Sequence, residues 1–253
     1  MTHGSLFSGI GGFDLAAEWM GWENKFHCEW NPFGQKVLAH HFPNSKSYND
    51  ITKTNFSIHA GQVDVLTGGF PCQPYSASGK RLGKEDDRHL WPQMLRAIKE
   101  IQPRWIVGEN VYGLVNWSDG LVFHEVQADL EAEGYEVFPY LLPAASVNAP
   151  HRRDRIWFVA YSNKIRLSCK MEDRKLGGQF RFAKCNKYNE WDTFTTESAI
   201  CGENDGIPKE LDSISISKWK NESLMAYGNA VCPQVVYQIF KTIEQYENLN
   251  QWI

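Results

Sequence analysis

The sequence of 253 residues lacks the patterns of several protein classes. No apolar run approaches the ~20 residues that a membrane-spanning helix requires. The opening "MTHGSLFSGIGG" has neither the basic start nor the long apolar stretch of a signal peptide. Internal repeats and low-complexity tracts are missing as well. The composition, 42% hydrophobic and 22% charged, predicts a cytoplasmic globular protein of one domain, with room for a small inserted lobe.

Paired cysteines are also missing. The six cysteines are scattered, and no CxxC pair occurs among them. In an intracellular protein of this size they are expected to be reduced thiols, not a disulfide framework. Zinc binding by Cys169, Cys185 and Cys201 is conceivable, but the spacing of metal ligands is lacking. We therefore predict no metal site.

An overall positive charge is lacking too, because the net charge is −4, and this excludes a wholly basic nucleic-acid binder. The charge is unevenly distributed. Residues 151–189 hold eleven Lys/Arg against three Asp/Glu, which gives +8 there and −12 over the rest of the chain. A solvated loop is the simpler interpretation, but such asymmetry is also typical of a surface that faces a polyanion.

What is present is an alternation of strand-like and helix-like segments. Strands are predicted at 3–8, 24–30, 63–70, 104–110, 135–142 and 155–161, and helices near 13–21, 32–42, 90–101 and 122–130. This alternation predicts an α/β doubly wound sheet over residues 1–162. Periodicity fails over 163–222, which we interpret as an inserted lobe. It returns in 223–253, in a helix behind Pro233.

Candidate functional residues follow four of the predicted strands. They are the glycines of "FSGIGGF" (7–13), Glu29, Cys72 and Glu109. In a doubly wound sheet the chemistry lies beyond the carboxyl ends of the strands, so these residues should share one edge. The glycine turn is not a complete GxGxxG pattern. With a carboxylate able to accept both ribose hydroxyls, it favours an adenosine-containing cofactor, either NAD or S-adenosylmethionine.

Residue type suggests roles for the other candidates. Cys72 lies between two prolines in "GGFPCQPYS" and is either a restrained nucleophile or a small core residue. Glu109 is either a proton-carrying acid whose pKa is raised by burial or a structural carboxylate. Arg153 and Arg155, two residues apart at the start of a strand, should lie on one face. The charged, glycine-punctuated stretch 78–91 is typical of a mobile lid.

Seven of these segments, in order, resemble the motifs of DNA (cytosine-5) methyltransferases. The resemblance covers nearly everything outside 163–222, and the combination of its motifs is highly specific. The motifs are "FSGIGGF", "EW" at 29–30, "NDI" at 49–51, "GGFPCQPYS", "ENV" at 109–111, "RRDRIWFV" and "YGNAVCPQV". It implies a Rossmann-like methyltransferase sheet with a small target-recognition lobe at 163–222, similar to compact phage- or prophage-type members.

The resemblance implies a role for each catalytic candidate. Cys72 would attack C6 of a cytosine, and Glu109 would hydrogen-bond or protonate the ring at N3. Arg155 would brace the base and Glu109, and Arg153 would orient the pocket.

The resemblance also implies a cofactor and a nucleic acid. S-adenosyl-L-methionine would be held by Phe7, Ser8, Gly9, Gly11, Glu29, Trp30, Asp50, Ile51, Gly69, Pro71, Leu90, Asn229 and Val231. Double-stranded DNA would contact Gln73, Ser76, Ser78, Lys80, Arg81, Lys170, Arg174 and Lys175.

Partners and alternatives complete the expectations. We expect a monomer without a membrane partner, and a cognate restriction endonuclease of the same system is a candidate partner. A tRNA cytosine-5 methyltransferase and a catalytically inactive DNA-binding paralogue remain as alternatives, and a NAD-dependent oxidoreductase is least favoured. The target sequence cannot be read from the lobe.

Overall fold

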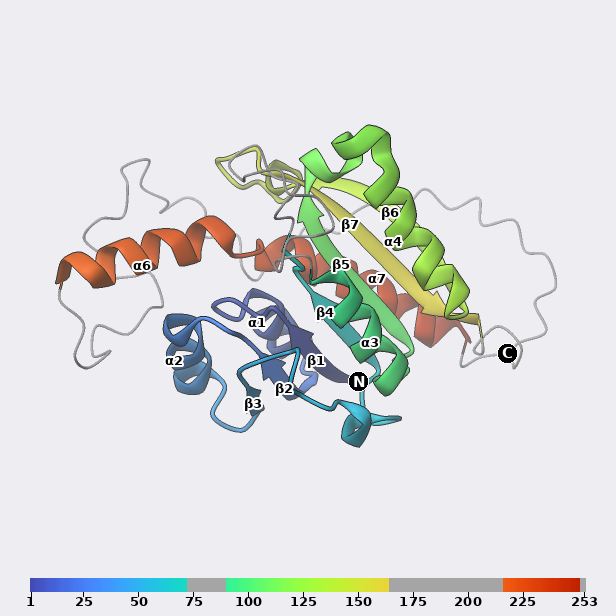
Figure 1. Cartoon of the computed structure of the whole chain (residues 1–253), viewed down its shortest axis with the longest axis horizontal. Coiled ribbons are helices and arrows are strands. Elements are labelled where there is room, and N and C mark those ends of the chain that lie inside the picture. Colours follow the sequence, from blue (N-terminus) through green and yellow to red (C-terminus); the bar gives the residue numbers. More distant parts are fainter. Residues whose placement is uncertain (72–89, 164–215, 251–253) are drawn as a thin grey trace.

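A computed structural model of the chain describes residues 1–71, 90–163 and 216–250 (Figure 1). Within these residues, seven strands form one sheet in the order β3-β2-β1-β4-β5-β7-β6. Their bounds are β1 Thr2–Leu6, β2 Glu23–Cys28, β3 Lys46–Tyr48, β4 Val65–Gly68, β5 Trp105–Val111, β6 Tyr135–Pro143 and β7 Asp154–Ser162. Cys72 and all the predicted DNA-binding residues lie outside the described residues.

The direction of the strands creates the edge on which the site is built. Strands β1 to β5 pair in parallel, whereas β7 runs antiparallel between β5 and β6. Strand β1 pairs with both β2 and β4, so the strand order reverses there. Ligands of open α/β sheets bind outside the carboxyl ends of the strands at such a switch point.

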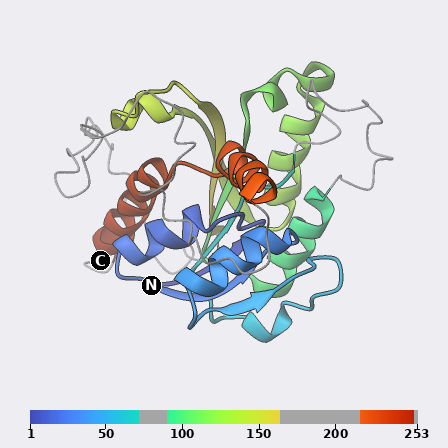
Figure 2. The same ribbon diagram turned by 90° about the vertical axis from the view of Figure 1, so that its left-hand side faces the viewer.

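Helices cover both faces of the sheet (Figure 2). On one face, α1 (Gly12–Trp19) and α7 (Pro233–Asn250) pack against Val65, Val107 and Trp157. On the other face, α3 (Trp91–Ile101) and α4 (Leu121–Ala132) pack against Leu66, Ile106 and Phe158. The remaining elements are α2 (Pro32–His41), α6 (Ile216–Asn229) and short 3₁₀ helices at Ser57–His59, Tyr112–Val115, Trp117–Gly120 and Ala144–Val147.

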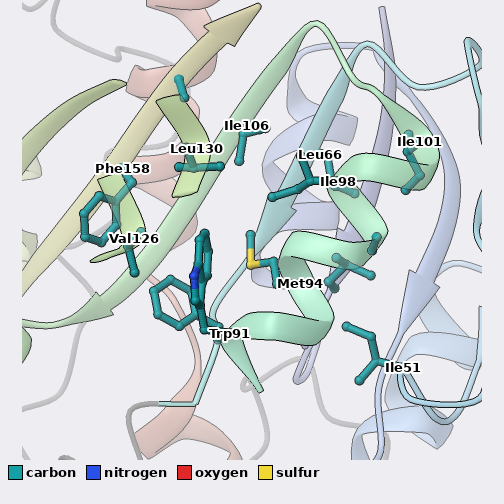
Figure 3. Packing of buried hydrophobic residues seen from close by; sticks show 14 of the residues in the cluster. Ile51, Leu66, Trp91, Met94, Ile98, Ile101, Ile106, Val126, Leu130 and Phe158 are labelled. Carbon is teal, nitrogen blue, oxygen red and sulfur yellow. The ribbon is translucent and has the colours of Figure 1, made fainter. Parts of the chain in front are cut away.

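The apolar residues of α3 lie on one face of the helix, and that face packs against the sheet. Met94, Ile98 and Ile101, which are spaced three or four residues apart, are all buried against the sheet (Figure 3). At the start of the helix, Trp91 donates from Nε1 to Asp129 Oδ2 of α4 at 2.7 Å. This contact ties α3 to α4 and fixes the helix that follows residues 72–89.

The α/β doubly wound sheet predicted from the sequence is confirmed, and it is Rossmann-like. Among the strands and α-helices, strand β3 and helix α6 were not predicted, and neither were the short 3₁₀ helices. Helix α6 continues across residue 222, where the sequence predicts the lobe to end, and the division into three segments stays a prediction. In the part of the chain that the structure describes, no helix has the length and apolarity to cross a membrane.

Candidate active site

The glycine turn (residues 7–12) follows β1 and requires an unusual backbone. Phe7, Gly9 and Gly11 all have positive φ, at 52°, 57° and 86°. Glycine is also needed sterically, since a Cβ on Gly11 would lie 2.5 Å from the Phe42 ring. A positive φ at a phenylalanine costs energy and persists only where the surroundings hold it. The surrounding structure therefore holds the turn in this conformation at the start of α1.

Glu29 lies directly beyond β2 and bonds to this turn. Its Oε2 accepts from Gly9 N at 2.7 Å, and its Oε1 accepts from Asn31 N at 2.7 Å. Burial raises the pKa of Glu29, and the backbone N–H donors oppose that rise. An ionised carboxylate has about four acceptor positions, and the backbone N–H groups of Gly9, Asn31 and Trp30 do not fill all of them. The structure thus brings together the glycine turn and the acid that were predicted to form one pocket.

The other predicted cofactor residues near β2 and β3 differ in their exposure and in their hydrogen-bond partners. Trp30 is 70% exposed, beside Glu29, and its ring face is open. Asp50 Oδ1 accepts from Thr52 N at 2.9 Å and from Thr52 Oγ1 at 2.6 Å, which closes a turn. Ile51 is buried in the core. Ser8 is also buried, and its hydroxyl bonds to the ends of β1 and β2.

The end of the chain returns to the glycine turn. A Cβ on Gly12 would lie 2.7 Å from Val231 Cγ2, so the two residues are in close contact. Helix α6, which ends at the exposed Asn229, packs through Trp219, Ala226 and Tyr227 beside α2 and Ile10. The structure thus places Val231 against the glycine turn, whereas closure of a cofactor pocket by the "GNAV" segment stays a prediction.

Glu109 lies near the carboxyl end of β5, and its side chain is 11% exposed. Its Oε1 is 2.9 Å from Arg155 Nε. Burial raises the pKa of Glu109 to about 7, although the charges of Arg155 and Arg153 lower it. A Cβ on Gly69 would be 3.4 Å from Glu109 Oε2, so the acid lies against the segment that leads to Cys72. It can therefore hold a proton near neutral pH beside that segment.

Asn110 is a site residue that the sequence reasoning did not single out. It is 2% exposed, and its Nδ2 donates to the Phe70 carbonyl at 3.0 Å. Its Oδ1 accepts from Val111 N at 2.9 Å, which fixes the amide. Asn110 therefore anchors the chain two residues before Cys72. The only available signal was its position beside Glu109 in "GENV".

The two arginines bind different partners. Arg155 belongs to β7 and contacts Glu109, whereas Arg153 precedes β7 with a φ of 41°. Arg153 Nη2 donates to the Gly228 carbonyl at 2.9 Å and to the Ala230 carbonyl. Strand alternation does not apply to Arg153, which lies outside the strand, but the charges of both arginines act on Glu109. Arg153 joins the start of β7 to the segment that contacts the glycine turn.

Pro71 and Leu90 border the undescribed residues 72–89 and are both partly buried. Leu90 is the N-cap residue that precedes α3. The sheet order, the glycine turn and the acid beyond β2 together define a Rossmann-like α/β protein with its site at the carboxyl edge.

Comparisons with known proteins narrow this class to a family. The family model of the C-5 cytosine-specific DNA methylase matches residues 1–199, and the chain belongs to this family. It is 30% identical to the type II methyltransferase M.BsuFI of Bacillus subtilis over 99% of this chain and 58% of that protein. It is 36% identical to M.Eco47II of Escherichia coli, over 63% of this chain and 39% of that one.

Solved structures agree with this placement. A prophage-encoded E. coli protein, assigned as a DNA modification methyltransferase, superposes with a TM-score of 0.56 and 26% identity. The match covers 68% of this chain and 49% of that one. The chain thus spans roughly half the length of the proteins that it resembles, between 39% and 58% of these three.

Proposed function

We propose that this protein is a DNA (cytosine-5)-methyltransferase. It would transfer a methyl group from S-adenosyl-L-methionine to C5 of a flipped-out cytosine, in a specific double-stranded sequence, through a covalent bond between Cys72 and C6. The observation that carries the proposal is the Glu109–Arg155 pair, held against Gly69 on the segment that leads into "PCQPYS". Family membership supports the same reading.

The residues at the glycine turn fit S-adenosyl-L-methionine. Glu29 keeps acceptor capacity for ribose hydroxyls, and the exposed ring of Trp30 offers a face for an adenine. The turn allows close approach of backbone N–H groups, and Val231 borders it from the far end of the chain. When bound, this cofactor supplies an electrophilic methyl group. The chain's own residues supply its position and exclude water.

The chemistry of the base explains why a thiol and an acid are needed together. C5 of cytosine is too weak a nucleophile to be methylated unaided. Attack of the Cys72 thiolate forms the C6–S bond and pushes electron density to C5, while Glu109 donates a proton or hydrogen bond to N3. Arg155 holds Glu109 in place. After methylation, loss of the C5 proton re-forms the C5–C6 double bond, and cleavage of the C6–S bond releases the Cys72 thiolate.

Neither C5 nor C6 can be reached in this way inside a duplex, so the cytosine must be flipped out. Residues 76–90 would close over it. The proposed DNA contacts of Gln73, Ser76, Ser78, Lys80 and Arg81, and those of the lobe, remain predictions from the sequence. So do the monomeric state, the cytoplasmic location and a cognate endonuclease.

Bisulfite sequencing of DNA from cells that express the protein tests this function. We expect cytosines within one short sequence to be protected from conversion, and no protection in cells that express Cys72→Ser. A parallel assay of purified protein on DNA and on tRNA separates the proposal from the tRNA alternative. If the protein methylates tRNA but not DNA, tRNA is its substrate. If it methylates neither nucleic acid, the assignment as a methyltransferase is contradicted.

Glu29→Ala should weaken the binding of S-adenosyl-L-methionine at least tenfold. The change removes the acceptor for two ribose hydroxyls, and each bond to a charged acceptor is worth roughly 1.5–3 kcal/mol. Calorimetry with purified protein measures the affinity. Glu23→Ala is the matched control, because Glu23 is an exposed carboxylate at the opposite end of the same strand. Equal affinity in wild type and Glu29→Ala would mean that the ribose lies elsewhere.

A further inference from the structure

A buried carboxyl group lies beneath the glycine turn. Asp14, in the first turn of α1, is 0% exposed. Within the described residues, no Lys or Arg forms an ion pair with it. Burial raises its pKa to about 7, and the Ser5 hydroxyl opposes that rise. Burying such a group is costly, so its retention calls for an explanation from its partners.

The partners of Asp14 form a chain of hydrogen bonds. Ser5 Oγ lies 3.0 Å from both carboxyl oxygens of Asp14, and 2.6 Å from Ser8 Oγ. Ser8 Oγ accepts from Cys28 N at 3.2 Å. One arrangement lets each hydroxyl donate once: Cys28 N–H to Ser8, Ser8 to Ser5, and Ser5 to the Asp14 carboxylate. All four residues are buried, so the chain is shielded from water.

Two members of this hydrogen-bond chain, Ser8 and Cys28, adjoin the two walls of the proposed cofactor pocket. Ser8 lies between Phe7 and Gly9, the two residues of the turn with φ near 55°. Cys28 directly precedes Glu29, and Gly9 N donates to Glu29 Oε2. Fixing Ser8 against Cys28 therefore sets the distance between the turn and the carboxylate. A strained turn needs such support if it is to exist before the cofactor arrives.

We infer that Asp14 is a positioning residue for the cofactor site: through Ser5 and Ser8, it holds the glycine turn and Glu29 in register. The inference rests on the proposed use of S-adenosyl-L-methionine at this turn. Asp14 contacts neither the cofactor nor the substrate in this account. Asp14 acts only through Ser5 and Ser8, whereas Glu29 is proposed to contact the cofactor itself.

Residues that act in series have a recognisable signature. A change at Asp14 or at Ser5 disturbs the same hydrogen-bond chain. The second change should therefore cause no further loss of cofactor affinity. Asp14→Asn replaces the charged acceptor of the Ser5 hydroxyl by a neutral one, and Ser5→Ala removes the donor. We expect each change to weaken S-adenosyl-L-methionine binding about fivefold, because only part of the free energy of a bond in this supporting chain reaches the cofactor. The double variant should also bind about fivefold more weakly, rather than about 25-fold more weakly as independent effects would give.

The experiment measures calorimetric affinity for S-adenosyl-L-methionine and thermal unfolding without it, at pH 8, for wild type, both single variants and the double variant. Glu23→Gln is the control, because Glu23 is an exposed carboxylate at the start of β2. In steady-state assays, the cofactor KM should rise about fivefold in Asp14→Asn while kcat stays within about twofold of wild type.

Each outcome is decisive. Failure of the wild type to bind the cofactor would overturn the proposed function itself. Normal binding by the wild type and by Asp14→Asn would overturn the role of Asp14 alone. Multiplying effects, or loss of the fold in both single variants, would make Asp14 a structural residue and would also overturn the inference.

Discussion

Cys72→Ser is expected to abolish methyl transfer while leaving the affinity for S-adenosyl-L-methionine nearly unchanged. The serine hydroxyl has a pKa far above that of a thiol, so it supplies almost no nucleophilic anion at neutral pH. Without the C6–S bond, C5 does not gain the electron density that it needs. The loss should therefore exceed that of any change to a residue that only positions the base.

A mechanism-based substrate gives a direct measurement. DNA that carries 5-fluorocytosine cannot lose a proton from C5, so the wild-type enzyme should stay covalently attached to it. The adduct is detected as a shifted band on a denaturing gel in the presence of cofactor. Cys232→Ser serves as the matched control, since Cys232 is a partly buried thiol whose pKa burial raises. An adduct formed by Cys72→Ser would contradict the assignment of the nucleophile.

Much of the edge where these residues meet could be predicted from the sequence. Buried parallel strands appear as short apolar runs, and their carboxyl ends must meet at one edge. The sheet register shows this, because Leu6 pairs with Cys28 and Gly68 pairs with Gly108. The glycine turn and Glu29 then follow from chain order alone. Their hydrogen bond could not be predicted, because it depends on side-chain rotamers.

Other features depend on tertiary contacts that leave weak signals. Strand β3 has three residues and lies at the edge of the sheet, so its sequence shows no buried pattern. Helix α6 packs beside α2 through Trp219, Ala226 and Tyr227 but exposes Leu224 and Met225, which hides its periodicity. Asn110 and Asp14 are polar residues in buried positions, and their importance appears only with their partners, Phe70 and Ser5.

Glu109→Gln is the second change with a large expected effect, and it should alter activity and stability in opposite directions. Glutamine can donate a hydrogen bond to N3 but cannot transfer a proton, so kcat should fall by roughly 10²–10⁴. The affinity for S-adenosyl-L-methionine should not change, because Glu109 lies away from Glu29 on a different strand. Single-turnover assays at saturating cofactor measure the loss, with the exposed Glu131→Gln as the matched control.

The effect on stability follows from the raised pKa. In the folded protein the pKa of Glu109 is about 7, against 4.5 ordinarily, so folding favours its protonated form. The stability that this group contributes is fully present below pH 4.5 and is lost as the pH rises through 7. At 1.36 kcal/mol for each pKa unit, the loss approaches about 3 kcal/mol. Glutamine is neutral throughout, so Glu109→Gln should be more stable than wild type at pH 8 and similar to it at pH 5.

Urea unfolding at the two pH values, without cofactor or DNA, measures this difference. A gain at pH 8 together with lost activity would show that the enzyme retains a destabilising buried acid for its chemistry. Arg155 provides an internal check, because its charge lowers the pKa of Glu109. Arg155→Gln should therefore raise the pKa of Glu109 further, and the protein with Glu109 intact should be less stable at pH 8.

One result would contradict the prediction for Glu109. If Glu109→Gln is less stable than wild type at pH 8, the Glu109–Arg155 ion pair outweighs the burial of Glu109, and a proton-holding role for Glu109 at neutral pH is wrong.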